Sequence, residues 1–254
     1  MTLLDRTSRR VELTAAGSAL QSEGRHLLTQ AQHAVRATQA AGSDRLTVGF
    51  YGSAAAALLP KVLRRFSERR PAAAITIREL LLGGVDDITT GDVDIAFTRL
   101  LPGQLDLELE VLACEPRLVA LAGDHRLAGR DSLLFADLRE ESFITNRVVP
   151  SPGPPIRWLA EQQRQGLPGR VAAEAASVHE ILALVAAGRG VCLVPASVAR
   201  HYPRPDVAYV EVSDAEPAVV SLAWRQESMR PIIEEFIDAA REAAVLIANG
   251  SRSR

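Results

Sequence analysis

The sequence has few of the residues that build disulfide frameworks and metal centres. Its 254 residues include only two cysteines, Cys114 and Cys192, which lie far apart and without a C-x-x-C partner. That spacing argues against both a disulfide framework and a zinc site. Cys192 lies in the apolar run 190–194, so we expect a small buried core residue there.

Long apolar runs and targeting segments are also missing. No run reaches the roughly 18 apolar residues that a membrane span needs, and no charged-then-apolar leader opens the chain. We therefore expect a cytoplasmic protein.

The motifs of common enzyme classes are missing as well. The sequence contains no G-x-S-x-G, no P-loop and no H-E-x-x-H, and its five histidines are scattered. The segment 49–52 is not a dinucleotide fingerprint. His179 lies in a capping-box pattern that begins at Ser177, which predicts a surface position in the first turn of a helix. The sequence predicts no catalytic residue, no metal and no cofactor.

The composition is that of a globular protein with a substantial core. Hydrophobic residues make up 47% of the chain and the mean hydropathy is +0.05, at a length that suits one or two domains. The formal net charge is only -2. Any contact with DNA must therefore be local.

The first 17 residues contain a basic turn between two short apolar segments. Leu3-Leu4 and 11–13 flank it, and we expect them to form a strand pair. Arginine guanidinium groups and hydroxyls both donate hydrogen bonds to phosphate oxygens, so the turn suits a phosphate contact. Its candidate residues are Arg6, Thr7, Arg9 and Arg10. On composition alone, a solvated N-terminal arm explains the same run, because charged runs are usually surface.

A single helix is predicted from Thr14, its N-cap, to about residue 41. Leu20, Gly24, Leu27, Ala31 and Ala34 follow the spacing of a coiled-coil seam, which Leu28 and Val35 widen. Such a helix is about 40 Å long, and it needs a partner because most helical stability comes from packing one face. We expect a homodimer or tetramer, with these dimerisation residues: Leu20, Leu27, Leu28, Ala31 and Val35.

Strands and helices alternate from residue 45 onward. Strands at 46–51, 75–80 and 93–97, with a helix face at 58–66, predict a mostly parallel sheet with right-handed crossovers. A second set begins near Asp124, with strands near 142–144, 171 and 191–194 and helices after Pro152 and from Ser177. The chain then crosses back near 219–224 and ends in a helix over 230–249. The sequence predicts two α/β lobes around a hinged cleft.

Four segments resemble LysR-type transcriptional regulators. The run L-L-D-R-T-S-R-R-V-E-L-T-A-A-G at 3–17 resembles the wing of their winged helix-turn-helix and the start of their linker helix, with Leu4 where Phe is usual. The segments 46–60, 91–97 and 184–196 are similar to three motifs of their effector-binding domain. G-F-Y-G-S and V-C-L-V-P-A-S look most like the branch that senses muconate and benzoate.

The resemblance implies a remnant wing at 1–13, a linker helix at 14–43 and a periplasmic-binding-protein-like effector domain at 44–254. Lobe I would take 45–122 and 225–249, and lobe II 123–224. With no recognition helix before the wing, DNA binding is expected to be weak and limited to phosphates. Two alternatives stay open: the first Met lies inside a longer reading frame, or the chain is a cytosolic solute-binding protein without a DNA-binding role.

The resemblance also implies a small-molecule effector between the lobes, and the physics of helix N-termini and strand ends favours an anion there. We expect a small organic anion, either an aromatic or a short-chain carboxylate. Ser53, with the amide of Ala54, is the leading candidate, although Ser53 could instead cap its helix. The candidate effector-binding residues are Ser53, Ala54, Gly83, Phe97, Thr98, Thr145, Pro152, Gly153 and Val194.

Two further features bear on the charge of the effector. Arg99 and Arg147 are candidate counter-charges. The muconate-sensing branch carries a threonine after its second strand, whereas 80–85 here reads L-L-L-G-G-V without a hydroxyl. We therefore expect a singly charged or more apolar effector rather than a dicarboxylate.

Overall fold

The computed structural model describes residues 1–6, 10–40, 42–82, 85–100, 107–146 and 170–251, in two compact units, Met1–Ser43 and Asp44–Arg254. In the first unit, β1 (Leu4–Arg6) pairs antiparallel with β2 (Val11–Leu13), as the sequence predicted. The helix α1 (Ala15–Ala40) follows. Thr14 caps it, because its Oγ1 accepts from the Gly17 amide at 3.0 Å.

The apolar stripe of α1 is exposed to solvent in the single chain. The large side chains of the predicted seam are between 53% and 66% exposed: Leu20, Leu27, Leu28 and Val35. At the start of the helix, a Cβ on Gly17 would lie 2.0 Å from the carbonyl oxygen of Leu3. A glycine is therefore required where the helix passes the N-terminal strand.

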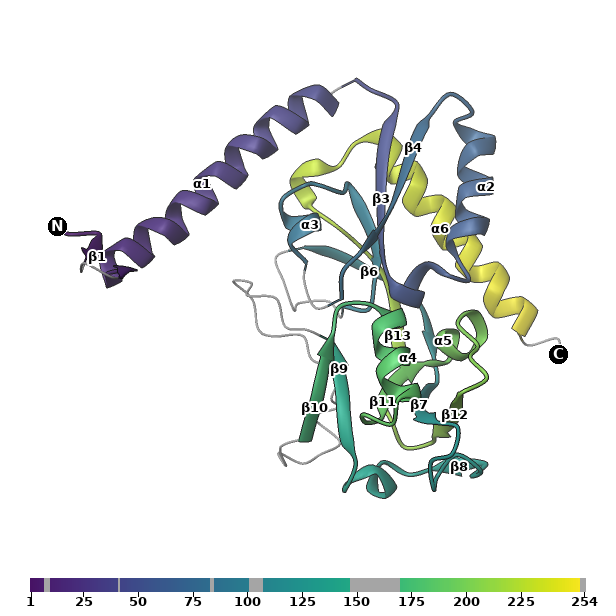
Figure 1. The fold of residues 1–254 in the computed structure, drawn as a ribbon. Coiled ribbons are helices and arrows are strands. Elements are labelled where there is room, and N and C mark those ends of the chain that lie inside the picture. Colours follow the sequence, from purple (N-terminus) through teal and green to yellow (C-terminus); the bar gives the residue numbers. More distant parts are fainter. Residues whose placement is uncertain (7–9, 41, 83–84, 101–106, 147–169, 252–254) are drawn as a thin grey trace. The chain divides into compact units, whose positions relative to one another are not determined.

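Lobe I contains a five-stranded sheet, which is the upper part of the second unit in Figure 1. Across the sheet, its strands are β4 (Ala74–Leu80), β3 (Arg45–Tyr51), β5 (Ile95–Thr98), β13 (Ala218–Trp224) and β6 (Glu108–Glu115). β3 runs parallel to β4 and β5, whereas β13 is antiparallel to β5 and β6.

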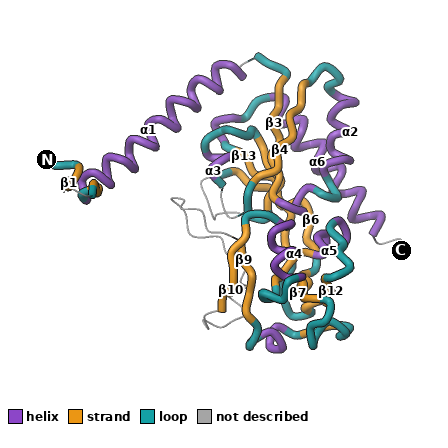
Figure 2. Tube along the Cα trace, viewed as in Figure 1, coloured by secondary structure: helices purple, strands orange, loops and turns teal. Residues whose placement is uncertain are grey.

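Two helices cover one face of this sheet and carry its core. α2 (Leu59–Arg69) and α6 (Pro231–Ser251) lie side by side, as Figure 2 shows. Phe236 of α6 makes edge-to-face contacts with Phe66 and Phe97, with ring centroids 5.4 and 6.3 Å apart. A short helix, α3 (Asp86–Thr89), precedes β5. Its Ile88 is buried in a different apolar cluster, which lobe I shares with lobe II.

Lobe II has a four-stranded sheet and a separate parallel pair. The sheet order is β11 (Cys192–Pro195), β7 (Arg117–Ala122), β12 (Val207–Val212) and β8 (Ser132–Leu133), and the pair is β9 (Ser142–Asn146) with β10 (Arg170–Ala175). α4 (Val178–Ala186) packs against both, and α5 (Ala196–His201) follows β11. Short 3-10 turns span Gly52–Ala55, Phe135–Leu138 and Gln226–Ser228.

The strand order corrects two expectations. The chain enters lobe II at Pro116 rather than after residue 122, because β7 pairs with β11 and β12. It returns before β13, which lies inside the lobe I sheet, rather than after residue 224. The sheets are also mixed rather than mostly parallel. β7 is antiparallel to both its neighbours, whereas β3 runs parallel to β4 and β5, β9 to β10, and β12 to β8.

Three smaller expectations, on Ser177, His179 and Cys192, are confirmed. Ser177 caps α4, since its Oγ accepts from the Glu180 amide at 3.2 Å. His179 is exposed in the first turn of that helix, and Cys192 is fully buried in β11. Among the residues that the structure describes, no helix is long and apolar enough to cross a membrane.

Candidate functional site

Four polar side chains meet where the two lobes join, and we call them the junction cluster: Ser53, Arg99, Glu115 and Ser197. Three come from lobe I, where Ser53 lies two residues after β3, Arg99 directly follows β5 and Glu115 ends β6. Ser197 comes from lobe II, in the first turn of α5. Strand ends bring these residues together although Ser53 and Ser197 are 144 residues apart in sequence.

Arg99 is at the centre of the junction cluster. Its Nη2 lies 3.0 Å from the Oγ atoms of both Ser53 and Ser197, and 2.7 Å from Oε1 of Glu115. Its Nη1 donates to the carbonyl oxygen of Val219 at 3.0 Å. The guanidinium is therefore fixed by lobe I and touches a hydroxyl from each lobe.

Glu115 connects the same cation to lobe II. Its carboxylate accepts from the amide of Ser197 at 2.6 Å and from the hydroxyl of Ser197 at 3.0 Å. The Ser197 hydroxyl also lies 2.9 Å from Oγ of Ser53. Hydrogen bonds to a charged group are the stronger kind, so Glu115 holds the first turn of α5 against the end of β6.

The junction cluster lies largely out of water. The side chains of Arg99 and Glu115 are 10% and 17% exposed. Burial lowers the pKa of Arg99, and the neighbouring Glu115 carboxylate opposes that shift. Burial also lowers the pKa of Arg117, which lies close enough to interact electrostatically with both Arg99 and Glu115. Because arginine stays protonated in proteins, the site keeps a buried positive charge that Glu115 balances.

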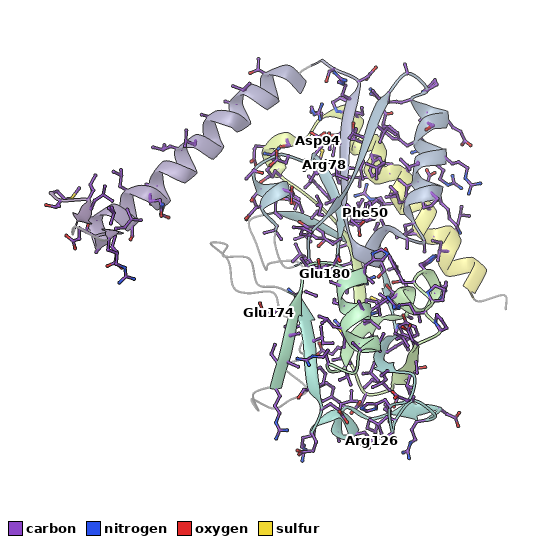
Figure 3. The ribbon with its side chains drawn as sticks, viewed as in Figure 1. Phe50, Arg78, Asp94, Arg126, Glu174 and Glu180 are labelled. Atoms are coloured by element: carbon purple, nitrogen blue, oxygen red, sulfur yellow. The ribbon has the colours of Figure 1, made fainter. Side chains whose placement is uncertain are left out.

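The lobes approach each other closely beside the cluster. Gly52 has φ +51°, and a Cβ there would lie 2.7 Å from Cγ2 of Val178 in α4. The amide of Leu82 in lobe I donates to the carbonyl of Ala176 in lobe II at 2.8 Å. Glu180, labelled at the junction of the lobes in Figure 3, accepts from the amide of Ala176. Glycine at position 52 thus permits a contact that any side chain would obstruct.

Several residues predicted from the sequence lie at or near this junction. Ser53 and Arg99 are in contact. Thr98 is buried at the end of β5, where its Oγ1 accepts from the Leu100 amide at 3.3 Å. Thr145 is buried in β9 and donates to Asn146 at 3.2 Å. Val194 belongs to the apolar cluster shared by the two lobes.

Other expectations need correction. Phe97 does not line the junction, because it packs against Phe236 in the cluster under α2 and α6. Ala54 is buried in that same cluster. Ser53 does not cap a helix: its hydroxyl contacts Arg99 and Ser197, and α2 begins only at Leu59. Four expected site residues lie outside the described residues: Gly83, Arg147, Pro152 and Gly153.

Sequence reasoning missed Glu115 and Ser197. Ser197 follows a buried strand, as Ser53 does, so a search for hydroxyls after each strand would have found it. Glu115 gives no such signal, since a single carboxylate before a proline usually marks surface. The described residues contain no group of three His, Cys, Asp or Glu side chains that could hold a metal ion.

Two α/β lobes, joined by crossing strands with a buried cation at their junction, form a two-lobe domain. Residues 39–245 match the family model of the LysR substrate binding domain. The chain therefore belongs to the LysR-type transcriptional regulators.

Individual relatives agree with this assignment. The chain is 31% identical over 247 residues to the Hca operon transcriptional activator HcaR of Escherichia coli, covering 94% of this chain and 82% of that protein. It is 28% identical to the HTH-type transcriptional regulator AlsR of Bacillus subtilis, covering 93% and 80%.

Solved structures share the fold. The LysR family regulator CbnR is 26% identical with a TM-score of 0.59, covering 94% of this chain and 84% of that one. Full-length BenM is 23% identical with a TM-score of 0.65, covering 98% and 84%. The two-lobe architecture predicted from the sequence is thus confirmed.

Proposed function

We propose that this regulator senses a small organic anion whose carboxylate binds at the junction cluster. One observation carries the proposal: a buried guanidinium, Arg99, contacts one hydroxyl from each lobe, Ser53 and Ser197. A ligand held by these three groups would bridge the lobes. Its binding would therefore change the contacts between the lobes. A sensor needs such a ligand-dependent structural change to pass its signal on.

The chemistry of the junction cluster favours a carboxylate. Guanidinium and hydroxyl donors match carboxylate oxygens in geometry and charge. The Ser53 hydroxyl accepts from Arg99 and lies 2.9 Å from the Ser197 hydroxyl, whose one hydrogen is shared between Ser53 and Glu115. A ligand oxygen that replaces one of these contacts could bond the Ser53 hydroxyl. Glu115 occupies part of the donor capacity of Arg99. An incoming carboxylate must compete with Glu115 or draw on the nearby Arg117.

The charge of the site favours one carboxylate rather than two. Arg99 and Glu115 balance each other, and Arg117, a further cation near both, already interacts with Glu216. The segment after β4, residues 81–85, contains no hydroxyl side chain, and Leu82 is buried in the shared apolar cluster. An aromatic or short-chain monocarboxylate fits this combination of one charged end and an apolar remainder.

Relatives point to the same class of effector and to its output. One solved structure is the BenM effector-binding domain with its effector benzoate, and another is full-length CbnR in complex with its target DNA. By this likeness, our chain acts on DNA in the cytoplasm, and its basic turn would contact phosphates through Arg6, Thr7, Arg9 and Arg10. Because the curated relatives are transcriptional regulators, we favour regulation over solute binding alone.

Assembly follows from the exposed stripe on α1. We propose that residues 14–43 form a linker helix that pairs with a second copy, since more than half of each large apolar side chain of the stripe is exposed. Pairing two such helices removes this apolar surface from water. Residues 44–254 would then sense the effector, in a dimer or tetramer.

The direct test is a panel of carboxylic acids, read by thermal shift and then by calorimetry. Benzoate-like acids and short-chain monocarboxylates should stabilise the protein, and dicarboxylates should do so less. Losing one hydrogen bond to a charged group costs about 1.5–3 kcal/mol, so Ser53→Ala should weaken binding roughly 10- to 100-fold. Ser213→Ala is the matched control, because Ser213 bonds only the Leu133 carbonyl within lobe II. If no anion binds, or if the two variants behave alike, the assigned site is wrong.

A further inference from the structure

A tyrosine beside the junction cluster has a buried hydroxyl without a hydrogen-bond partner. Tyr51, the last residue of β3, is 6% exposed, and its Oη has no partner among the described residues. Buried tyrosine hydroxyls usually find a partner, and each exception needs an explanation. Tyr51 also lies only two residues before Ser53, so the same strand end supplies both side chains.

Strand geometry directs Tyr51 toward lobe II. Phe50 pairs with Phe97 of β5, and both belong to the cluster under α2 and α6. Side chains alternate along a strand, so Tyr51 points to the opposite face, and its partner in the register with β4 is Leu80. Tyr51 belongs there to the apolar cluster shared by the lobes, together with Val178 of α4.

The surroundings of Tyr51 leave its hydroxyl as a neutral donor. Burial raises its pKa, and the carboxylates of Asp87 and Asp86 raise it further. Its packing partners Leu80 and Leu82 are apolar, and they offer nothing for the hydroxyl to bond. Asp86 and Asp87 act on the hydroxyl only electrostatically, since no hydrogen bond joins them to it among the described residues. The group that completes it must therefore bring an acceptor oxygen.

We propose that Tyr51 determines specificity by donating a hydrogen bond to a second oxygen of the effector, on the part remote from its carboxylate. The effector is then an oxygenated monocarboxylate, such as a hydroxy- or oxo-substituted aromatic or short-chain acid. This inference rests on the proposed function, in which Ser53 and Arg99 hold the carboxylate. The Tyr51 hydroxyl would let the protein distinguish between acids of similar size and the same charge.

The test compares acids that differ by one oxygen: benzoate with the three hydroxybenzoates, and propanoate with lactate. In the wild type, at least one oxygenated acid should bind about tenfold more tightly than its parent. Tyr51→Phe, which removes only the hydroxyl, should reduce that preference to less than about twofold. Its melting temperature should not fall, because the hydroxyl has no hydrogen-bond partner among the described residues.

Trp224→Phe is the control. Trp224 also has a buried donor without a partner in the part of the chain that the structure describes, but it lies in the cluster under α6. It should keep the full preference. If acids bind but Tyr51→Phe retains the preference, or if no oxygenated acid is preferred, the role of Tyr51 is refuted and the carboxylate site survives. If no acid binds the wild type at all, the proposed function fails and this inference fails with it.

Discussion

Replacing Glu115 by glutamine tests whether the junction cluster holds the lobes together. The change keeps size and shape but removes the charge that balances Arg99, and the new amide nitrogen cannot accept from Ser197. Breaking a buried ion pair costs about 3–5 kcal/mol. Since the Arg99 and Glu115 side chains are 10% and 17% exposed, solvent reduces this, and we expect a loss of about 2–3 kcal/mol.

The assay is thermal unfolding followed by circular dichroism. A domain of this size changes its melting temperature by about 2–4 °C for each kcal/mol, so Glu115→Gln should lower it by roughly 4–12 °C. Glu110→Gln is the matched control. Glu110 forms a two-pronged pair with Arg241, which is 54% exposed, and an exposed pair is worth about 0–1 kcal/mol.

A bound acid should partly restore the thermal stability of the Glu115→Gln variant. With Glu115 neutral, Arg99 has no competing carboxylate, so an acid that binds the wild type should raise the melting temperature of Glu115→Gln by more degrees. Equal destabilisation by Glu115→Gln and Glu110→Gln would refute the claim that the buried pair fixes the lobes. A smaller ligand-induced rise in Glu115→Gln than in the wild type would refute the competition between carboxylates.

Three further outcomes follow from the described contacts. Gly52→Ala should destabilise the protein by about 1–2 kcal/mol in urea unfolding, because φ is +51° and a Cβ in this conformation is strained, whereas Gly129→Ala, in open space, should change little. Burial raises the pKa of Cys192 to about 12, so at pH 8 a thiol reagent should label only the exposed Cys114 until denaturant is added; two labelled thiols in the folded protein would contradict this. Leu27→Asp should convert the oligomer to monomer in light scattering, because it places a charge in the α1 seam, and a wild type that is already monomeric would remove the basis for that seam.

Strand ends could be predicted from the sequence because they follow local patterns. Apolar runs followed by a hydroxyl or a cation marked Ser53 and Arg99, and parallel connectivity brought their strand ends to one edge. The face of the sheet on which the Phe97 side chain lies could not be predicted in the same way. All four residues of β5 are buried, so no polar alternation distinguishes its two faces.

The lobe boundary and the partners of Arg99 depend on long-range pairing. Residues 108–122 form two strands interrupted only around Pro116, and nothing local assigns them to different sheets. Arg99 and Glu115 lie at the ends of β5 and β6, which both pair with β13, and no local pattern predicts that long-range pairing. Ser197 reaches the same cation only because lobe II folds back onto lobe I.

The most direct test is a crystal structure of the full chain with an acid that stabilises it in the thermal-shift panel. A carboxylate oxygen of the bound acid should lie within about 3.2 Å of both Nη2 of Arg99 and Oγ of Ser53, which is hydrogen-bond distance. An acid bound on any other surface, with the contacts among Ser53, Arg99, Glu115 and Ser197 unchanged, would contradict the assignment of the junction cluster as the effector site.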